Sequence, residues 1–165
     1  MKCLASFALA AARVLAATGS RNAQDCGSMT NWDLHGTYTM TGHGWIDLSK
    51  LVATLPAGSI PMTWVGALSY NGTGGGSGWV SVNAGGVQMN AQFVNLSYQM
   101  NGDCSVSVNY SMKVKELGLT LGPAARLLIV SGTPGALELQ GISVGYGPGT
   151  LVDVLTMRRV SMQFK

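Results

Sequence analysis

Hydrophobic and polar residues alternate along most of the chain after residue 34, and residues 104–115 show this pattern most clearly. Serine, asparagine and lysine residues fill one phase of this segment. The other phase consists of Val106, Val108, Tyr110, Met112 and Val114. Such alternation is typical of a strand with one buried and one solvated face.

The same pattern predicts eight strands, separated by turn signals such as NGTGGG, NGD and GYGPG. They are expected at residues 34–47, 62–70, 77–84, 87–100, 104–115, 125–131, 136–143 and 151–164. Because hairpins join them in order, the expected fold is all-β, an eight-stranded antiparallel up-and-down β-barrel, whose closure leaves no exposed edge. A two-sheet sandwich is the alternative. A phase change near Phe93 and Val94 predicts a β-bulge.

The amino terminus has the pattern of an export signal. Lys2 precedes an apolar stretch and small residues that a signal peptidase could cut, so we expect a signal peptide over 1–17, an arm over 18–33 and a barrel domain over 34–165. A short helix of the mature protein is the alternative. No stretch has membrane-spanning length, so the expectation is a secreted, extracytoplasmic protein without an integral membrane span.

Charge argues against a nucleic-acid partner. Once Lys2 and Arg13 leave with the signal, the ten lysine and arginine residues become eight, against seven acidic residues. The remaining basic residues are dispersed, whereas phosphate recognition needs a basic patch. The sequence indicates no oligomeric state.

The cysteine pattern predicts how one end of the barrel is closed. Cys3 leaves with the signal, so Cys26 and Cys104 remain and should form a disulfide. Strands 1 and 5 begin at the same end, so this bond should draw residues 27–33 across that end, with Trp32 as its plug. The connections 48–61 and 116–124 then lie at the other end, and they carry Leu48, Leu51, Leu55, Leu117, Leu119 and Leu121.

An entrance lined by apolar loops suggests a hydrophobic small molecule as partner, although these leucines could instead cap the core. The valine phase of the last strand, with Met162 and Phe164, is expected to face inward, and this phase includes Arg158 but not Arg159. The candidate ligand-binding residues are Tyr38, Trp64, Tyr70, Tyr98, Tyr110 and Arg158. Arg158 and Tyr110 are also the catalytic candidates, because a cation and a phenol can stabilise charge on a carbonyl oxygen. A filled core is the alternative.

Other site chemistry finds little support. His35 and His43, the two histidines, lie too far apart along one strand to share a metal ion, and there is no G-x-S-x-G motif. We therefore expect neither a metal nor a cofactor. Asn71, Asn95 and Asn109 each begin an N-x-S/T sequon and are candidates for glycosylation in a eukaryotic secretory route.

Four segments together resemble a known group of proteins. They are C-x7-L-H-G-T-Y (26–38), W-V-G-A-L-S-Y-N-G (64–72), N-G-D-C-S (101–105) and R-L-L-I-V...M-R-R-V (126–160). Across residues 26–160 the chain resembles small exported, mostly uncharacterised bacterial β-barrel proteins, similar in fold to lipocalin-like and allene-oxide-cyclase-like barrels, dirigent proteins included. The resemblance implies binding of a hydrophobic ligand or steering of a reactive intermediate, and it carries over no catalytic residue.

Three functions follow as hypotheses. The first is a secreted barrel that binds a hydrophobic small molecule in its cavity. The second is a cofactor-free cyclase, isomerase or dirigent-type enzyme that works by preorganising its substrate. The third is a structural surface protein with a solid barrel.

Overall fold

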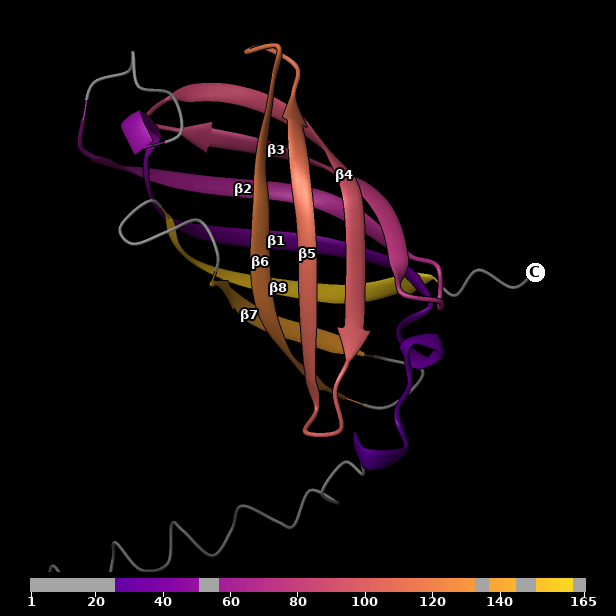
Figure 1. Cartoon of the computed structure of the whole chain (residues 1–165). Helices are drawn as coiled ribbons and strands as arrows, with labels where there is room; N and C mark the ends of the chain where they lie inside the picture. The colour runs from indigo at the N-terminus through magenta and orange to yellow at the C-terminus, as the bar shows by residue number, and fades with distance from the viewer. Residues whose placement is uncertain (1–25, 51–56, 133–136, 145–150, 162–165) are drawn as a thin grey trace, which may run out of the picture.

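The computed structural model describes residues 26–50, 57–132, 137–144 and 151–161, and its fold is a closed barrel (Figure 1). The strands are β1 (Gly36–Asp47), β2 (Ser59–Tyr70), β3 (Gly75–Ala84), β4 (Val87–Met100), β5 (Ser105–Val114), β6 (Leu119–Ser131), β7 (Glu138–Ser143) and β8 (Leu151–Ser161). Each strand pairs antiparallel with its neighbours in sequence, and β8 closes the ring on β1. The predicted eight-stranded up-and-down barrel is confirmed, and the sandwich alternative is wrong.

Most predicted strands match the observed ones within a few residues, but β6 begins earlier than expected. The connection predicted over 116–124 is a turn at residues 115–118, and β6 starts at Leu119. The segment LTLGPA is not predicted as part of the strand because it contains a proline, which cannot donate a hydrogen bond to a sheet ladder. Proline is nevertheless tolerated where the ladder is irregular. The β5–β6 register shifts between Tyr110 and Met112, opposite Gly122 and Pro123, and this irregularity accommodates the proline.

The predicted β-bulge lies in β4. The register of β4 with β5 shifts between Val94 and Ser97, and Asn95 has a positive φ of 54°. Asparagine tolerates this left-handed conformation better than most residues. The shift lets Phe93 and Leu96 both face the interior, although they belong to different phases of the sequence.

The arm that precedes β1 closes one end of the barrel, which we call the disulfide end. Cys26 and Cys104 form the predicted disulfide, with their Cα atoms 5.0 Å apart. The arm forms two short 3-10 turns, η1 (Cys26–Ser28) and η2 (Asn31–Leu34), and not an extended segment. Asn31 attaches the arm to the C-terminal end of β4, because its Oδ1 accepts a hydrogen bond from the backbone N–H of Met100 at 2.7 Å.

The plug differs from the prediction. Trp32 is 62% exposed and stacks on His35 with ring centroids 4.8 Å apart, so it does not fill the barrel. Leu34 is fully buried instead, and Met29 packs against the core beside it. In a 3-10 turn successive side chains point in different directions. The larger aromatic residue therefore lies outside while the smaller leucine lies inside.

The two faces of β8 are reversed relative to the prediction. Leu155 and Met157 are buried, whereas Val154 is exposed, as are Val152 and Val160. Consequently Arg158 points outward, with a side chain 73% exposed and 3.4 Å from Glu138, and Arg159 points inward. Both phases of LVDVLTMRRV alternate equally well, so only the pairing of β8 with β1 decides which one faces inward. Met162 and Phe164 lie outside the described residues.

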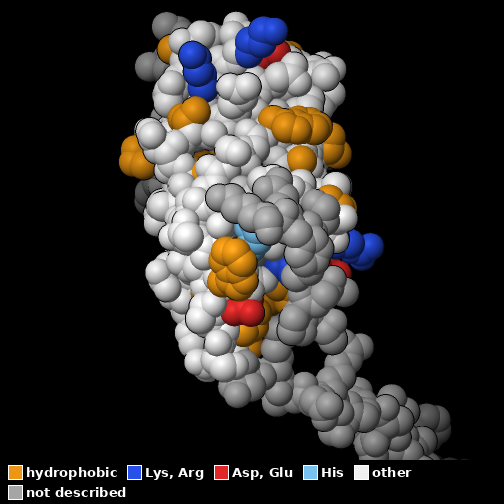
Figure 2. Space-filling view, turned by 90° about the vertical axis from the view of Figure 1, so that its right-hand side faces the viewer, with side chains coloured by type: hydrophobic (Ala, Val, Ile, Leu, Met, Phe, Trp, Pro, Cys, Tyr) orange, Lys and Arg blue, Asp and Glu red, His pale blue; other side chains and the backbone are white. Residues whose placement is uncertain are grey.

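On the side seen in Figure 2, hydrophobic and charged side chains are scattered over the surface. Within the described ranges, no helix has the length and apolar character needed to cross a membrane. The predicted signal peptide over 1–17 lies outside the described residues.

The adjacent arginines of β8 provide a matched test of this orientation. Arg159 donates hydrogen bonds to the Tyr38 hydroxyl and to the carbonyl of Asp33, and so ties the arm to the barrel. We expect Arg159→Met to lower the free energy of unfolding by about 1.5–3 kcal/mol in urea denaturation. Arg158→Met should change it by less than about 0.5 kcal/mol. A larger loss for Arg158→Met would contradict the orientation.

The disulfide closes a loop with a sequence separation of 78 residues, so its removal should be costly. We expect the variant Cys26→Ser with Cys104→Ser to lose about 2–5 kcal/mol of unfolding free energy relative to the oxidised protein. A reducing agent should lower the stability of the wild type and leave the variant unchanged. Equal urea midpoints for the oxidised wild type and the variant would argue against a structural role for the bond.

Candidate functional site

A cavity lies inside the barrel at the end opposite the disulfide, which we call the cavity end. It contains about 80 Å³ of free space, room for several water-sized groups. Its lining comes from seven strands and the β5–β6 turn: Met40, Ile46, Met62, Trp64, Val80, Val82, Met89, Ala91, Phe93, Met112, Val114, Leu117, Leu121, Arg126 and Leu151. Among the described residues of this lining, Arg126 is the one charged side chain, so a molecule inside would meet almost wholly apolar walls.

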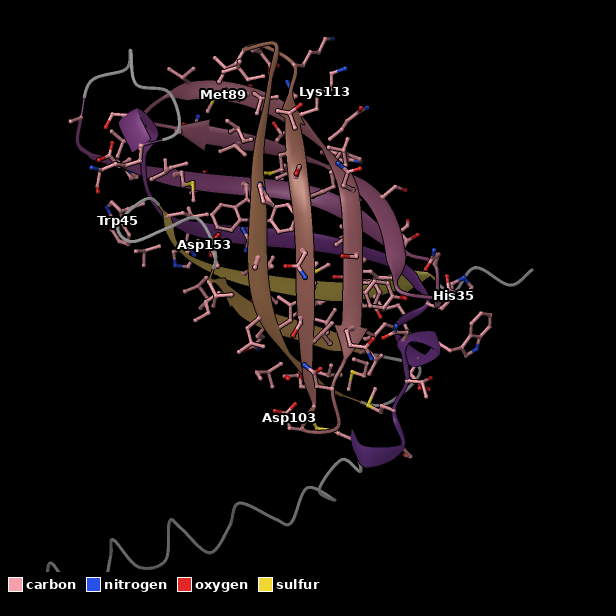
Figure 3. The ribbon with its side chains drawn as sticks, in the orientation of Figure 1. His35, Trp45, Met89, Asp103, Lys113 and Asp153 are labelled. Carbon is pink, nitrogen blue, oxygen red and sulfur yellow. A yellow bond between two sulfur atoms is a disulfide. The ribbon has the colours of Figure 1, made fainter. Side chains whose placement is uncertain are left out.

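The position of the cavity agrees with the predicted entrance. Leu117 and Leu121, two of the leucines expected there, line it. Figure 3 shows Met89 and Trp45 at this end, and His35 and Asp103 at the other. Leu51 and Leu55 lie outside the described residues, and the side chain of Leu48 is not described.

Methionine side chains give the walls their adaptability. Met40, Met62, Met89 and Met112 come from four different strands and all line the cavity. Methionine is unbranched and changes its conformation easily, so it can fit irregular apolar shapes. The cavity could therefore accept a molecule larger than its free space of about 80 Å³.

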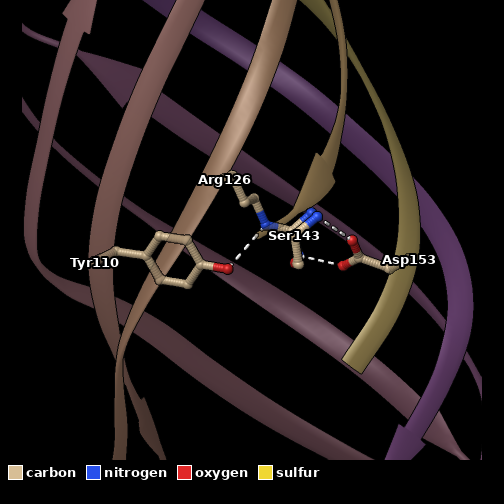
Figure 4. Close-up of polar contacts among 4 residues, drawn as sticks. All are labelled: Tyr110, Arg126, Ser143 and Asp153. Carbon is tan, nitrogen blue, oxygen red and sulfur yellow. Dashed lines mark hydrogen bonds and ion pairs between the residues drawn. The ribbon is translucent and has the colours of Figure 1, made fainter. Parts of the chain in front are cut away.

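Arg126 and Trp64 line the cavity, and Arg126 also contacts Tyr110, which lines the deeper space. The Arg126 Nε donates a hydrogen bond of 2.8 Å to the Tyr110 hydroxyl (Figure 4). Its guanidinium carbon also lies 5.5 Å from the centre of the Trp64 ring, within the range of a cation–π contact. The side chain of Arg126 is 13% exposed, so the cation is largely removed from water.

Asp153 neutralises this buried cation. Its Oδ2 lies 2.5 Å from the Arg126 Nη2, and its Oδ1 accepts the backbone N–H of Ser143 at 2.8 Å (Figure 4). The ladder between β7 and β8 ends at Gly141 and Leu155, so the Asp153 carboxylate bonds Ser143 beyond the end of the ladder. We call Tyr110, Arg126, Ser143 and Asp153 the polar layer. Its two charges are buried as a pair, which is the condition under which charges persist inside proteins.

Two glycines of β1 make room beside this layer. A Cβ atom at Gly42 would lie 2.1 Å from the Trp64 ring, and one at Gly44 would lie 2.9 Å from the Asp153 Cβ. Both glycines occupy inward positions, directly opposite Trp64 and Asp153 in the ladders. Larger residues there would displace the indole or the carboxylate, so the segment TGHGW shapes the site without contributing a side chain.

A cluster of Tyr38, Tyr70 and Tyr98 fills the barrel nearer the disulfide end. The Tyr70 ring centre lies 5.5 Å from that of Tyr38 and 4.4 Å from that of Tyr98. The Tyr38 hydroxyl bonds Leu34 and Arg159, and the Tyr98 hydroxyl bonds Gly72 and Asn31. Burial raises the pKa of all three phenols, so they stay neutral in the folded protein.

The Tyr70 hydroxyl differs from the other two. It is buried and has no hydrogen-bond partner among the described residues. Tyr70 lines a second, deeper cavity of about 20 Å³, which also has Arg126 and Tyr110 in its wall. This space suits one water molecule. Arg126, which lines both spaces, therefore lies between the apolar cavity and the small deep one.

The structure divides the predicted ligand-binding residues into groups. Trp64 lines the apolar cavity and Tyr110 belongs to the polar layer, whereas the three residues of the tyrosine cluster lie deeper. All five aromatic side chains are buried, as expected. Arg158, expected to point inward, lies on the outer surface instead, so it does not line the cavity.

Sequence reasoning missed Arg126 and Asp153. A signal for Arg126 was present, since it shares a phase with Leu128 and Val130, which are buried. No sequence signal indicated that Asp153 is buried, because a carboxylate within an apolar strand is ordinarily predicted to face water. Its burial depends on a partner that is distant in sequence.

The remaining candidates lie on the surface or near it. His43 is exposed on β1, and His35 stacks on Trp32 beyond the other end of that strand. No three His, Cys, Asp or Glu side chains of the described residues gather where they could hold a metal ion. Asn71, Asn95 and Asn109 are all exposed.

Two tyrosines of the cluster allow a paired test of the Tyr70 hydroxyl. Tyr98→Phe removes hydrogen bonds to Gly72 and Asn31, and we expect it to cost about 1–3 kcal/mol of unfolding free energy. Tyr70→Phe removes a hydroxyl without a described partner, so its effect should lie within about 0.5 kcal/mol or be stabilising. Urea denaturation of the two variants and the wild type would measure both changes in unfolding free energy. A loss for Tyr70→Phe as large as that for Tyr98→Phe would show that the Tyr70 hydroxyl is bonded.

Comparisons of the chain with family models, with curated proteins and with solved structures found no match in any of the three.

Proposed function

We propose that this protein is an exported barrel that binds a small hydrophobic molecule in the apolar cavity, with one end of the molecule at the polar layer. The observation that carries the proposal is the position of a single paired cation, Arg126, at the base of an otherwise apolar space. Sites for apolar ligands combine such walls with a few placed polar groups. A solid structural barrel, the third hypothesis, has no need of this space.

Export is supported by the disulfide between Cys26 and Cys104. Such bonds form and persist mainly in oxidising compartments outside the cytoplasm. The signal peptide over 1–17 is part of the same proposal, as is the kinship with lipocalin-like or allene-oxide-cyclase-like barrels.

A cofactor-free cyclase or isomerase is the second candidate, and the contact between Arg126 and Tyr110 favours it. A guanidinium and a phenol at the base of a water-poor cavity can polarise a carbonyl oxygen and stabilise the charge that develops on it. The apolar walls would hold a flexible substrate in one folded shape. Mass analysis of a bound molecule before and after incubation separates this enzyme from a carrier.

Ligand binding can be tested with 1-decanol as a probe. Trp64 is the buried tryptophan in the cavity, whereas Trp32, Trp45 and Trp79 are exposed, so a bound molecule should change the blue-shifted part of the emission. We expect saturable binding by the wild type. Native mass spectrometry of the purified protein should in addition reveal a co-purifying apolar molecule.

Replacement of two alanines by phenylalanine tests whether the molecule binds in the cavity. Ala91→Phe places a ring in the cavity and should weaken decanol binding by at least about tenfold. Ala67 lies on β2 outside the cavity lining, so Ala67→Phe should leave the affinity within about twofold. The proposal is wrong if decanol does not bind, or if both variants bind it as the wild type does.

A further inference from the structure

The charges of the polar layer determine which end group a ligand can place against it. Arg126 lines both the apolar and the deep cavity, so a molecule that enters from the cavity end meets this residue at the inner end of the apolar walls. An unpaired arginine in this position would favour a carboxylate, because a guanidinium matches carboxylate geometry. In this protein the guanidinium is already paired with the Asp153 carboxylate.

Asp153 occupies the carboxylate position from within the protein. Its side chain is fully buried and contacts Arg126 at 2.5 Å, while the N–H of Ser143 bonds its other oxygen. A second carboxylate beside this pair would bring an extra negative charge into a space where the described residues of the lining include no other cation. Burial of a charge without its own counterion is strongly unfavourable.

Uncharged polar groups face no such penalty. A hydroxyl or carbonyl oxygen needs only a hydrogen-bond donor, and guanidinium N–H groups serve as donors without a change in net charge. One layer deeper lies the Tyr70 hydroxyl, which is buried and lacks a described partner. Its burial also raises its pKa, so this group remains an uncharged donor.

Resting on the proposed function, we propose that the barrel selects amphipathic ligands with an uncharged polar head, such as an alcohol, aldehyde, ketone or ester, and rejects the corresponding carboxylates. Asp153 is then the residue that determines specificity, because it neutralises Arg126 before any ligand arrives. The apolar walls hold the body of the ligand and do not distinguish one head group from another.

Three probes with the same carbon chain test this selection in the wild-type protein. They are 1-decanol, methyl decanoate and decanoate, titrated by tryptophan fluorescence and calorimetry. Decanol and the ester are kept below their solubility limits, and decanoate below its micelle concentration. We expect decanol and the ester to bind at least about tenfold more tightly than decanoate, because only decanoate carries a charge. Decanoate binding that equals or exceeds decanol binding overturns the inference but leaves the proposed function standing. Binding of none of the three overturns the proposed function itself.

A charge change at Asp153 should reverse the preference. Asp153→Asn keeps the size of the side chain and one of its two acceptor oxygens but leaves the Arg126 charge without this counterion. Decanoate affinity should therefore rise at least about tenfold and exceed that of decanol. The double variant Arg126→Gln with Asp153→Asn removes both charges and should again favour decanol. If Asp153→Asn folds, as far-ultraviolet circular dichroism and the urea midpoint report, and still rejects decanoate, the inference is wrong. If it does not fold, the three wild-type titrations decide.

Discussion

Closure of the barrel by β8 against β1 is the constraint on which the interior depends. The register that pairs Gly42 with Leu155 and Gly44 with Asp153 decides which face of β8 looks inward. A shift by a single residue would bring Arg158 and the valines inside and turn Asp153 out to solvent. Arg126 would then lose its counterion, and the arm would lose its contact with Arg159.

From this closure follows an interior arranged in successive layers along the barrel. The apolar cavity lies at the cavity end, and Arg126 of the polar layer lines both this cavity and the deeper one. The tyrosine cluster lies nearer the disulfide end, which the disulfide-bound arm covers (Figure 1). The two inward-facing arginines, Arg126 and Arg159, make different contacts. Arg159 is bonded to Tyr38 and to the arm and so has a structural task, whereas Arg126 reaches the cavity.

The proposed recognition of an uncharged head group would give the Arg126–Asp153 pair a role beyond stability. Burial of two charges costs about as much as their attraction returns, so an apolar pair of similar size would serve folding equally well. The surroundings of the pair also serve its placement, since Gly42 and Gly44 leave room for Trp64 and Asp153. A paired charge at the base of an apolar cavity can discriminate between ligands without binding any of them strongly by charge.

The sequence by itself determined the strand order, the β-bulge of β4 and the disulfide, because these depend on local alternation, turn residues and a count of cysteines. It also placed Tyr38, Trp64, Tyr70, Tyr98 and Tyr110 in the interior. Only the tertiary structure decided the orientation of β8, the exposure of Trp32 and the partnership of Arg126 with Asp153. Alternation has two equivalent phases, and a buried charge is recognisable only when its partner on a distant strand is known, so these features depend on how the ring closes.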